Sequence, residues 1–118
     1  MKILVVDDEL PFTNMFVDFL ESEGYEAVKA FTGDQAKWLM KDKDFDLVIA
    51  DVHMPDGTGI DLTKWIKNRN SNQNIFLISG NLELDQEEFR SLGIDKFYLK
   101  PIDFRELSSD LKTLQVSE

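Results

Sequence analysis

The chain of 118 residues has no cysteine and a single histidine. A disulfide framework and a thiolate metal site are therefore excluded, and this composition suits the cytoplasm, where we expect the protein to work. No apolar run approaches the length of a membrane-spanning helix, and strand-like residues begin directly after Met1 with no apolar leader. We expect no membrane segment.

Positive charge is scarce. Lysine and arginine number 13 against 23 acidic residues, so the formal net charge is −10. Such a surface repels the phosphate backbone of nucleic acids, and we expect no direct nucleic-acid binding. Carboxylates gathered in one place would instead attract a cation.

The composition that is present, with 42% hydrophobic and 11% aromatic residues, indicates a globular protein. The length fits one domain over residues 1–118, and no repeat, linker or low-complexity segment divides it. We expect no output domain within this chain.

Short apolar runs alternate with amphipathic segments along the chain. Five strands alternating with five helices predict an α/β fold, a parallel sheet with helices on both faces. The predicted strands are residues 2–6, 26–30, 46–50, 74–79 and 96–99.

The helices carry recognisable end signals. Pro11 is expected near the start of the first helix, and Gly24 and Gly93 are expected to end the first and the fourth. Candidate capping pairs are Thr32 with Gln35, Thr58 with Asp61, Asp85 with Glu88 and Asp103 with Glu106. The aromatic residues expected in the core are Phe12, Phe16, Phe19, Trp38 and Trp65.

Polar side chains gather where the predicted strands end. In an open parallel sheet, ligands bind outside the carboxyl ends of the strands. Residues expected there are Asp7, Asp8 and Glu9 after the first strand, Asp51 after the third, Ser79 at the end of the fourth and Lys100 after the fifth. Each alone is equally compatible with a solvated turn or a surface side chain, so their convergence is what indicates a site.

Clustered carboxylates need a cation or protons. All-oxygen ligands suit Mg²⁺, with Mn²⁺ as an alternative, and such a metal would offset the charge of a phosphoryl group. Ser79 offers one hydrogen bond and Lys100 a point charge to that group, which leaves Asp51 as the attacking carboxylate.

At this point the sequence resembles the receiver domains of two-component response regulators over nearly its whole length. The motifs are ILVVDDE, DVHMPDGTG, LISGN and LKP, and Asp51 is followed by Pro55 and Gly59 at the family's spacing. The resemblance implies a flavodoxin-like, doubly wound fold with strand order 2-1-3-4-5.

The resemblance also implies the roles of individual residues. Asp51 is expected to be the phosphoacceptor. Asp8, Asp51 and the backbone carbonyl of His53 are expected to bind the metal, with Asp7 acting through water. Lys100, joined to the next residue by a cis bond, is expected to pair with phosphoryl oxygens.

Further implied positions concern switching and lifetime. Ser79 and Phe97 match the switch hydroxyl and the switch aromatic residue, and Gly80 leaves room for the phosphoryl group. His53 and Asn81 match the positions that tune the lifetime of the acyl phosphate. Asp95 with Lys96 departs from the acidic pair of many DNA-binding relatives, so their dimer contacts are not expected here.

The implied function is acceptance of a phosphoryl group from a sensor histidine kinase or a phosphotransfer protein. The output would pass to an unknown partner or to a missing C-terminal effector domain. The domain would catalyse only its own phosphorylation and dephosphorylation, and would not otherwise be an enzyme.

Three alternatives stay open from the sequence. A flavodoxin-like FMN binder would share the sheet but needs a hydroxyl-rich loop where Asp7–Asp8–Glu9 lies. An aspartyl-phosphate phosphatase would want an acid at position 53, where the chain has His53. A receiver-like binding module that takes no phosphate is the third.

Overall fold

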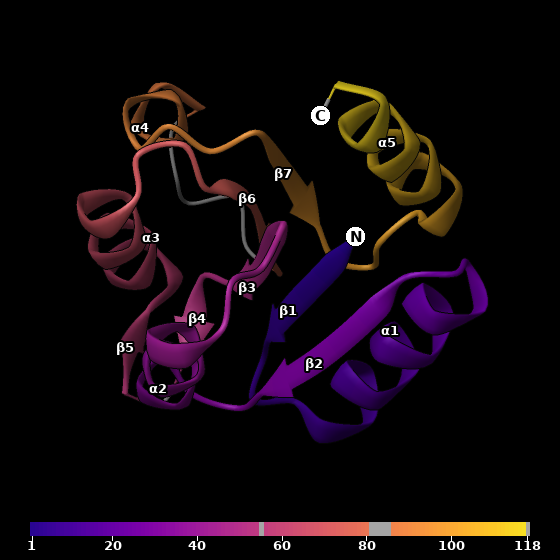
Figure 1. Cartoon of the computed structure of the whole chain (residues 1–118), viewed down its shortest axis with the longest axis horizontal. Coiled ribbons are helices and arrows are strands. Elements are labelled where there is room, and N and C mark those ends of the chain that lie inside the picture. Colours follow the sequence, from indigo (N-terminus) through magenta and orange to yellow (C-terminus); the bar gives the residue numbers. More distant parts are fainter. Residues whose placement is uncertain (55, 81–85, 118) are drawn as a thin grey trace.

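The computed structural model describes residues 1–54, 56–80 and 86–117. Its centre is a sheet of five parallel strands in the order β2-β1-β3-β6-β7 (Figure 1). The strands are β1 Lys2–Val6, β2 Glu26–Ala30, β3 Leu47–Asp51, β6 Asn74–Ser79 and β7 Lys96–Leu99. Because β4 and β5 belong to a separate hairpin, this is the predicted order 2-1-3-4-5, and the predicted fold class is confirmed.

Helices cover both faces of the sheet, with α1 and α5 on one face and α2, α3 and α4 on the other (Figure 1). They are α1 Leu10–Ser22, α2 Gly33–Asp42, α3 Gly59–Arg69, α4 Gln86–Ser91 and α5 Phe104–Ser117. Successive residues of β1 serve opposite halves of the core: Ile3 packs with α1 and α5, whereas Leu4 packs with α2 and α3. This double burial explains the continuous apolar runs of the strands.

The helix-end signals have the expected physical basis. The hydroxyl oxygen of Thr32 accepts the N–H of Gln35 at 3.0 Å, and that of Thr58 accepts the N–H of Asp61 at 3.1 Å. Gly24 and Gly93, which follow α1 and α4, have positive φ values. Of the predicted pair Asp85 and Glu88, Asp85 lies outside the described residues.

Some local predictions were wrong. β3 begins and ends one residue later than predicted, so Asp51 is its last residue. A small antiparallel hairpin, β4 His53–Met54 with β5 Gly57–Thr58, was not predicted. Trp38 was expected in the core but is 66% exposed on α2, whereas Phe16 is fully buried as predicted. Within the described part of the chain, none of the helices has the length and apolar character needed to cross a membrane.

Candidate functional site

The strand register brings the predicted site residues to one edge of the sheet. Asp51 on β3 pairs with Ile78 on β6, and Ser79 pairs with Leu99 on β7. The main-chain N–H of Lys100 donates to the carbonyl of Ser79 at 2.9 Å, which fixes where the lysine leaves the sheet. Residues that are distant in sequence therefore meet because neighbouring parallel strands end together.

Lys100 is the centre of this cluster. Its Nζ lies 2.7 Å from Oδ2 of Asp51, 3.1 Å from Oδ2 of Asp7 and 3.5 Å from Oε1 of Glu9. Asp7 and Asp51 are buried, with 1% and 5% of their surface exposed. A buried carboxylate is costly unless a partner offsets its charge, so the ammonium stabilises both acids. The Lys100–Pro101 bond is cis, as predicted.

The pKa values of Asp7 and Lys100 are both raised, but for different reasons. Burial, followed by repulsion from Asp51, raises the pKa of Asp7 to about 6, although the N–H of Glu9 and the ammonium of Lys100 oppose the rise. Burial lowers the pKa of Lys100, but its hydrogen bond and attraction to Asp51 outweigh this, and the net shift is upward. Lys100 therefore stays charged. Its single positive charge does not fully offset the burial and mutual repulsion of the carboxylates, as the raised pKa of Asp7 shows.

An open cleft of about 510 Å³ gives access to these groups. Its lining consists of Asp8, Glu9, Asp51, His53, Met54, Gly80 and Lys100. A small anion or a hydrated cation can thus reach both Asp51 and Asp8 from solvent.

The segment after β3 is tied closely to Asp51. The N–H of His53 donates to Oδ1 of Asp51 at 2.8 Å, and the N–H of Gly59 donates to the carbonyl of Val52 at 2.7 Å. The side chain of His53 is exposed. One carboxylate oxygen of Asp51 is therefore held by the main chain, while the other faces Lys100.

The donor set fits Mg²⁺. Asp8 and Asp51 line the same cleft, and Asp7 shares Lys100 with Asp51. Four carboxylates and one ammonium, counting Glu9, leave a formal charge of −3 at this edge. The described residues contain no group of three or more His, Cys, Asp or Glu side chains arranged to hold a metal ion. Mg²⁺ usually keeps several waters and takes one or two protein carboxylates, so a smaller set of ligands suits it.

The predicted switch residues Ser79 and Phe97 lie on the neighbouring strands β6 and β7. Ser79 ends β6 and is 1% exposed, and Gly80 lines the cleft. Phe97 on β7 stacks on Phe89 of α4, with ring centroids 4.2 Å apart and planes 25° apart. Asn81 lies outside the described residues, as does Pro55 of the loop motif.

Some contacts could not be foreseen from the sequence. Glu9 was noted after the first strand, but its ion pair with Lys100 was not predicted. Thr13 on α1 donates its hydroxyl to the carbonyls of Asp7 and Glu9, both at 3.0 Å, which anchors the acidic segment to the helix. The sequence places Thr13 in the first turns of a helix but does not indicate which groups its hydroxyl contacts.

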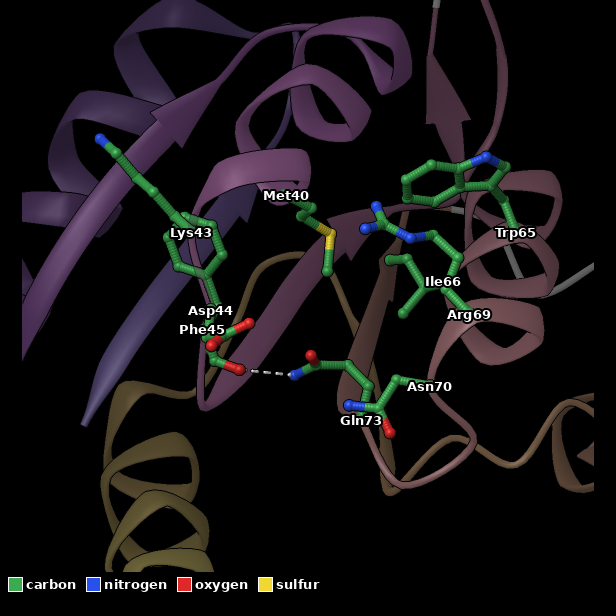
Figure 2. Close-up of a pocket in the computed structure, with 9 residues that line it drawn as sticks. All are labelled: Met40, Lys43, Asp44, Phe45, Trp65, Ile66, Arg69, Asn70 and Gln73. Carbon is green, nitrogen blue, oxygen red and sulfur yellow. Dashed lines mark hydrogen bonds between the residues drawn. The ribbon is translucent and has the colours of Figure 1, made fainter.

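A second cavity, of about 330 Å³, lies near the amino ends of β3 and β6, away from the site (Figure 2). Nε2 of Gln73 donates to the carbonyl of Phe45 at 3.0 Å, and the guanidinium of Arg69 lies 4.7 Å from the ring centroid of Trp65. The ammonium of Lys43 points away from this cavity (Figure 2). The polar groups that line this cavity are dispersed, whereas those around Asp51 converge on one ammonium.

Comparison with known proteins agrees with this geometry. Residues 3–112 match the response regulator receiver domain family. The transcriptional regulatory protein CpxR of Escherichia coli K12 is 35% identical over 113 residues, which are 96% of this chain and 48% of CpxR. The chain thus spans about half the length of the curated relatives that it matches.

Solved structures show the same likeness. The response regulator TrrA from Thermotoga maritima, in complex with Mg²⁺-BeF, superposes with a TM-score of 0.87 at 30% identity, covering 96% of this chain and 97% of TrrA. A CheY-like receiver protein from Methanospirillum hungatei gives 0.90 at 26% identity, covering 97% and 93%.

The chain therefore belongs to the response regulator receiver domain family of two-component systems, as its motifs predicted. The family's function is phosphoryl acceptance, and its members are phosphorylation-switch modules.

Proposed function

We propose that Asp51 is the phosphoacceptor of this chain and that Lys100 and Ser79 assist the transfer. The observation that supports this most strongly is the 2.7 Å contact between Nζ of Lys100 and Oδ2 of the buried Asp51, at the floor of an open cleft. A carboxylate held between an ammonium and a main-chain N–H is oriented for attack while its charge is tolerated.

Asp8, Asp51 and the backbone carbonyl of His53 would hold Mg²⁺ directly, and Asp7 would do so through water; Mn²⁺ could replace it. When bound, the metal supplies positive charge against the phosphoryl oxygens. The formal charge of −3 on the surrounding side chains supports this assignment. TrrA, a relative, has been crystallised with Mg²⁺-BeF.

The chemistry asked of the chain itself is simple. A carboxylate oxygen of Asp51 attacks the phosphorus of a phosphohistidine on the partner, a P–O bond forms, and the P–N bond breaks with its electron pair kept by the imidazole. Lys100 stays within reach of the transferred oxygens and offsets their charge. Ser79 donates its hydroxyl hydrogen to one of them, and Gly80 leaves room beside it.

The output step would use the stack of Phe97 on Phe89. Movement of Ser79 toward the phosphoryl group would let Phe97 turn inward, which requires its stack on Phe89 to open and therefore repositions α4. His53, which lines the cleft, and Asn81 would tune how long the acyl phosphate survives.

The partners follow from this chemistry. We propose a sensor histidine kinase or a phosphotransfer protein as donor, and an output partner or a C-terminal effector domain as receiver of the signal. Residues 1–118 would form one cytoplasmic receiver domain that catalyses only its own phosphorylation and dephosphorylation, without binding nucleic acid or membrane itself. The length of CpxR, about twice the matched region, supports the effector domain as one option.

The assignment of Asp51 is tested by chemical trapping. The protein is treated with acetyl phosphate and Mg²⁺, and borohydride then reduces the acyl phosphate to homoserine. Tandem mass spectrometry is expected to find homoserine at position 51. Homoserine at another aspartate would refute the assignment, and its absence everywhere would favour a binding module that takes no phosphate.

A further inference from the structure

The ammonium of Lys100 has a neighbour besides its carboxylates. Nζ lies 4.5 Å from the centroid of the Phe12 ring, which belongs to the first turn of α1. An ammonium at this distance from the face of an aromatic ring is attracted by the ring's quadrupole. The half-buried ring of Phe12 packs against the core, as predicted, and also faces the ammonium of Lys100 at the functional site.

The ring of Phe12 is one of several described neighbours of the Lys100 ammonium. Asp51, Asp7 and Glu9 each place an oxygen within 3.5 Å of Nζ, and only 16% of the lysine side chain is exposed. Glu9 is different from the other two acids, because 63% of its side chain is exposed. It therefore draws the ammonium toward solvent, whereas the ring and the buried acids hold it in the site.

The ring itself is firmly placed. Phe12 packs on the fully buried Phe16, with ring centroids 5.6 Å apart, and Phe16 contacts Phe104 of α5 at 5.8 Å. The hydroxyl of Thr13 ties the same turn of α1 to the carbonyls that flank the acidic segment. The hydrogen bonds of Thr13 therefore hold the first turn of α1, with Phe12, in a fixed position relative to Asp7 and Glu9.

We propose that Phe12 is a positioning residue that holds the ammonium of Lys100 toward Asp51 by a cation–π contact. This inference rests on the proposed function of Lys100 and adds a residue to it. Without the ring, the flexible lysine side chain gains hydrated conformations near Glu9 and spends less time where phosphoryl oxygens arrive. The attraction comes from the quadrupole of the aromatic ring. An aliphatic side chain of similar volume has no such quadrupole and cannot hold the ammonium in the same way.

The first experiment measures the rate of phosphorylation by acetyl phosphate with Mg²⁺. Phe12→Leu keeps an apolar side chain and is expected to lower the rate roughly threefold to tenfold, whereas Phe12→Tyr is expected to keep it near the original value. The matched control is Phe19→Leu, because Phe19 lies on the same helix and packs on Phe104. A loss of packing alone would slow both leucine variants alike.

Progressively fluorinated phenylalanines at position 12 sharpen the test, since they weaken the quadrupole at nearly constant shape. The rate is expected to fall stepwise with each fluorine. A flat series, or equal rates for Phe12→Leu and the original protein, overturns the proposal.

A second readout needs neither metal nor phosphate. Hydrogens on the Cε of Lys100 should resonate upfield of other lysines in a ¹H–¹³C spectrum, because the neighbouring Nζ lies over the ring. Phe12→Leu should remove this shift. A normal Lys100 resonance in the original protein overturns the contact. An original protein that shows the upfield shift but accepts no phosphoryl group overturns the proposed function, which is a distinguishable result.

Discussion

Gly59, the first residue of α3, lies where two segments of the main chain approach closely. A Cβ built on Gly59 would lie 2.3 Å from the carbonyl oxygen of Asp51 and 3.0 Å from the Cα of Val52, both main-chain atoms that cannot rotate away. The helix α3 can therefore start against the end of β3 only if residue 59 is glycine. The motif spacing of the family has a steric cause in this chain.

Gly59→Ala is expected to lower the free energy of unfolding by about 1–3 kcal/mol, the usual range for an overpacked site. The same change should displace Asp51 and slow phosphorylation. Urea denaturation gives the stability. Gly80→Ala is the control, since a Cβ on Gly80 meets nothing within 4 Å, and it should unfold like the original protein. An unaltered midpoint for Gly59→Ala would show that the clash is relieved cheaply.

Single residues also mark the limit of what sequence can predict. The sequence named Asp51 and Lys100 because each follows a strand, and the structure brings their side chains into contact. Trp38 was wrongly expected in the core, because helical spacing shows that a face is apolar but not which neighbour covers it. Phe12 packs on the core as predicted, but its contact with the ammonium of Lys100 was not predicted. Trp38 remains largely exposed.

At the scale of elements, the loop after β3 is fastened to helix α2 by one side chain. The two carboxylate oxygens of Asp56 accept the N–H groups of Gly33 and Asp34, at 3.0 Å and 2.8 Å. These N–H groups belong to the first turn of α2 and have no partner within the helix. The hydrogen bond from Asp34 is the main cause that lowers the pKa of Asp56 below its ordinary value.

Asp56→Ala is expected to lower the free energy of unfolding by about 1 kcal/mol near neutral pH, as for loss of a helix cap. A carboxylate with a lowered pKa in the folded state stabilises the fold above its unfolded pKa, and that stability is lost as pH falls through the folded pKa. The difference between variant and original should therefore be full at neutral pH and should shrink once pH drops below the ordinary value of 3.8.

Urea denaturation across a pH series measures this difference. Asp18→Ala, which removes an exposed acid of α1, controls for the change in net charge. A difference for Asp56→Ala that is absent at neutral pH, or that grows on acidification, would contradict the capping role.

Elements were predicted where an apolar run or a helical period extends over enough residues. Most strands of the main sheet are marked by short continuous apolar runs, and the helices by apolar residues at helical spacing, so the sequence indicates both. The β4–β5 hairpin has only two residues in each strand, too few for alternation to register. Its position depends on contacts from other elements, such as the bonds of Asp56 to α2, which a local pattern does not contain.

For the whole molecule, the sheet's carboxyl edge concentrates negative charge on an already acidic protein. The chain has a net charge of −10, and the side chains around Lys100 keep −3 of it in one place. Parallel topology made this edge predictable, because all strands deliver their ends to it. Which of the carboxylates would contact Lys100 was not predictable, since this depends on side-chain packing.

Mg²⁺ is expected to raise the melting temperature of the unphosphorylated protein, because a ligand that binds only the folded state stabilises it. The rise should saturate with Mg²⁺ concentration, disappear on chelation, and be strongly reduced in Asp8→Asn. Sodium chloride at matched ionic strength separates binding from general screening. An equal rise with sodium chloride, or an undiminished rise in Asp8→Asn, would contradict a specific site.

The most direct measurement is the intact mass of the protein after incubation with acetyl phosphate, for the original chain and for Asp51→Asn, each with Mg²⁺ and with chelator. The mass of one phosphoryl group should be gained only by the original chain with Mg²⁺. A gain by Asp51→Asn, or none by the original chain under any condition, would contradict the assignment of Asp51 as phosphoacceptor.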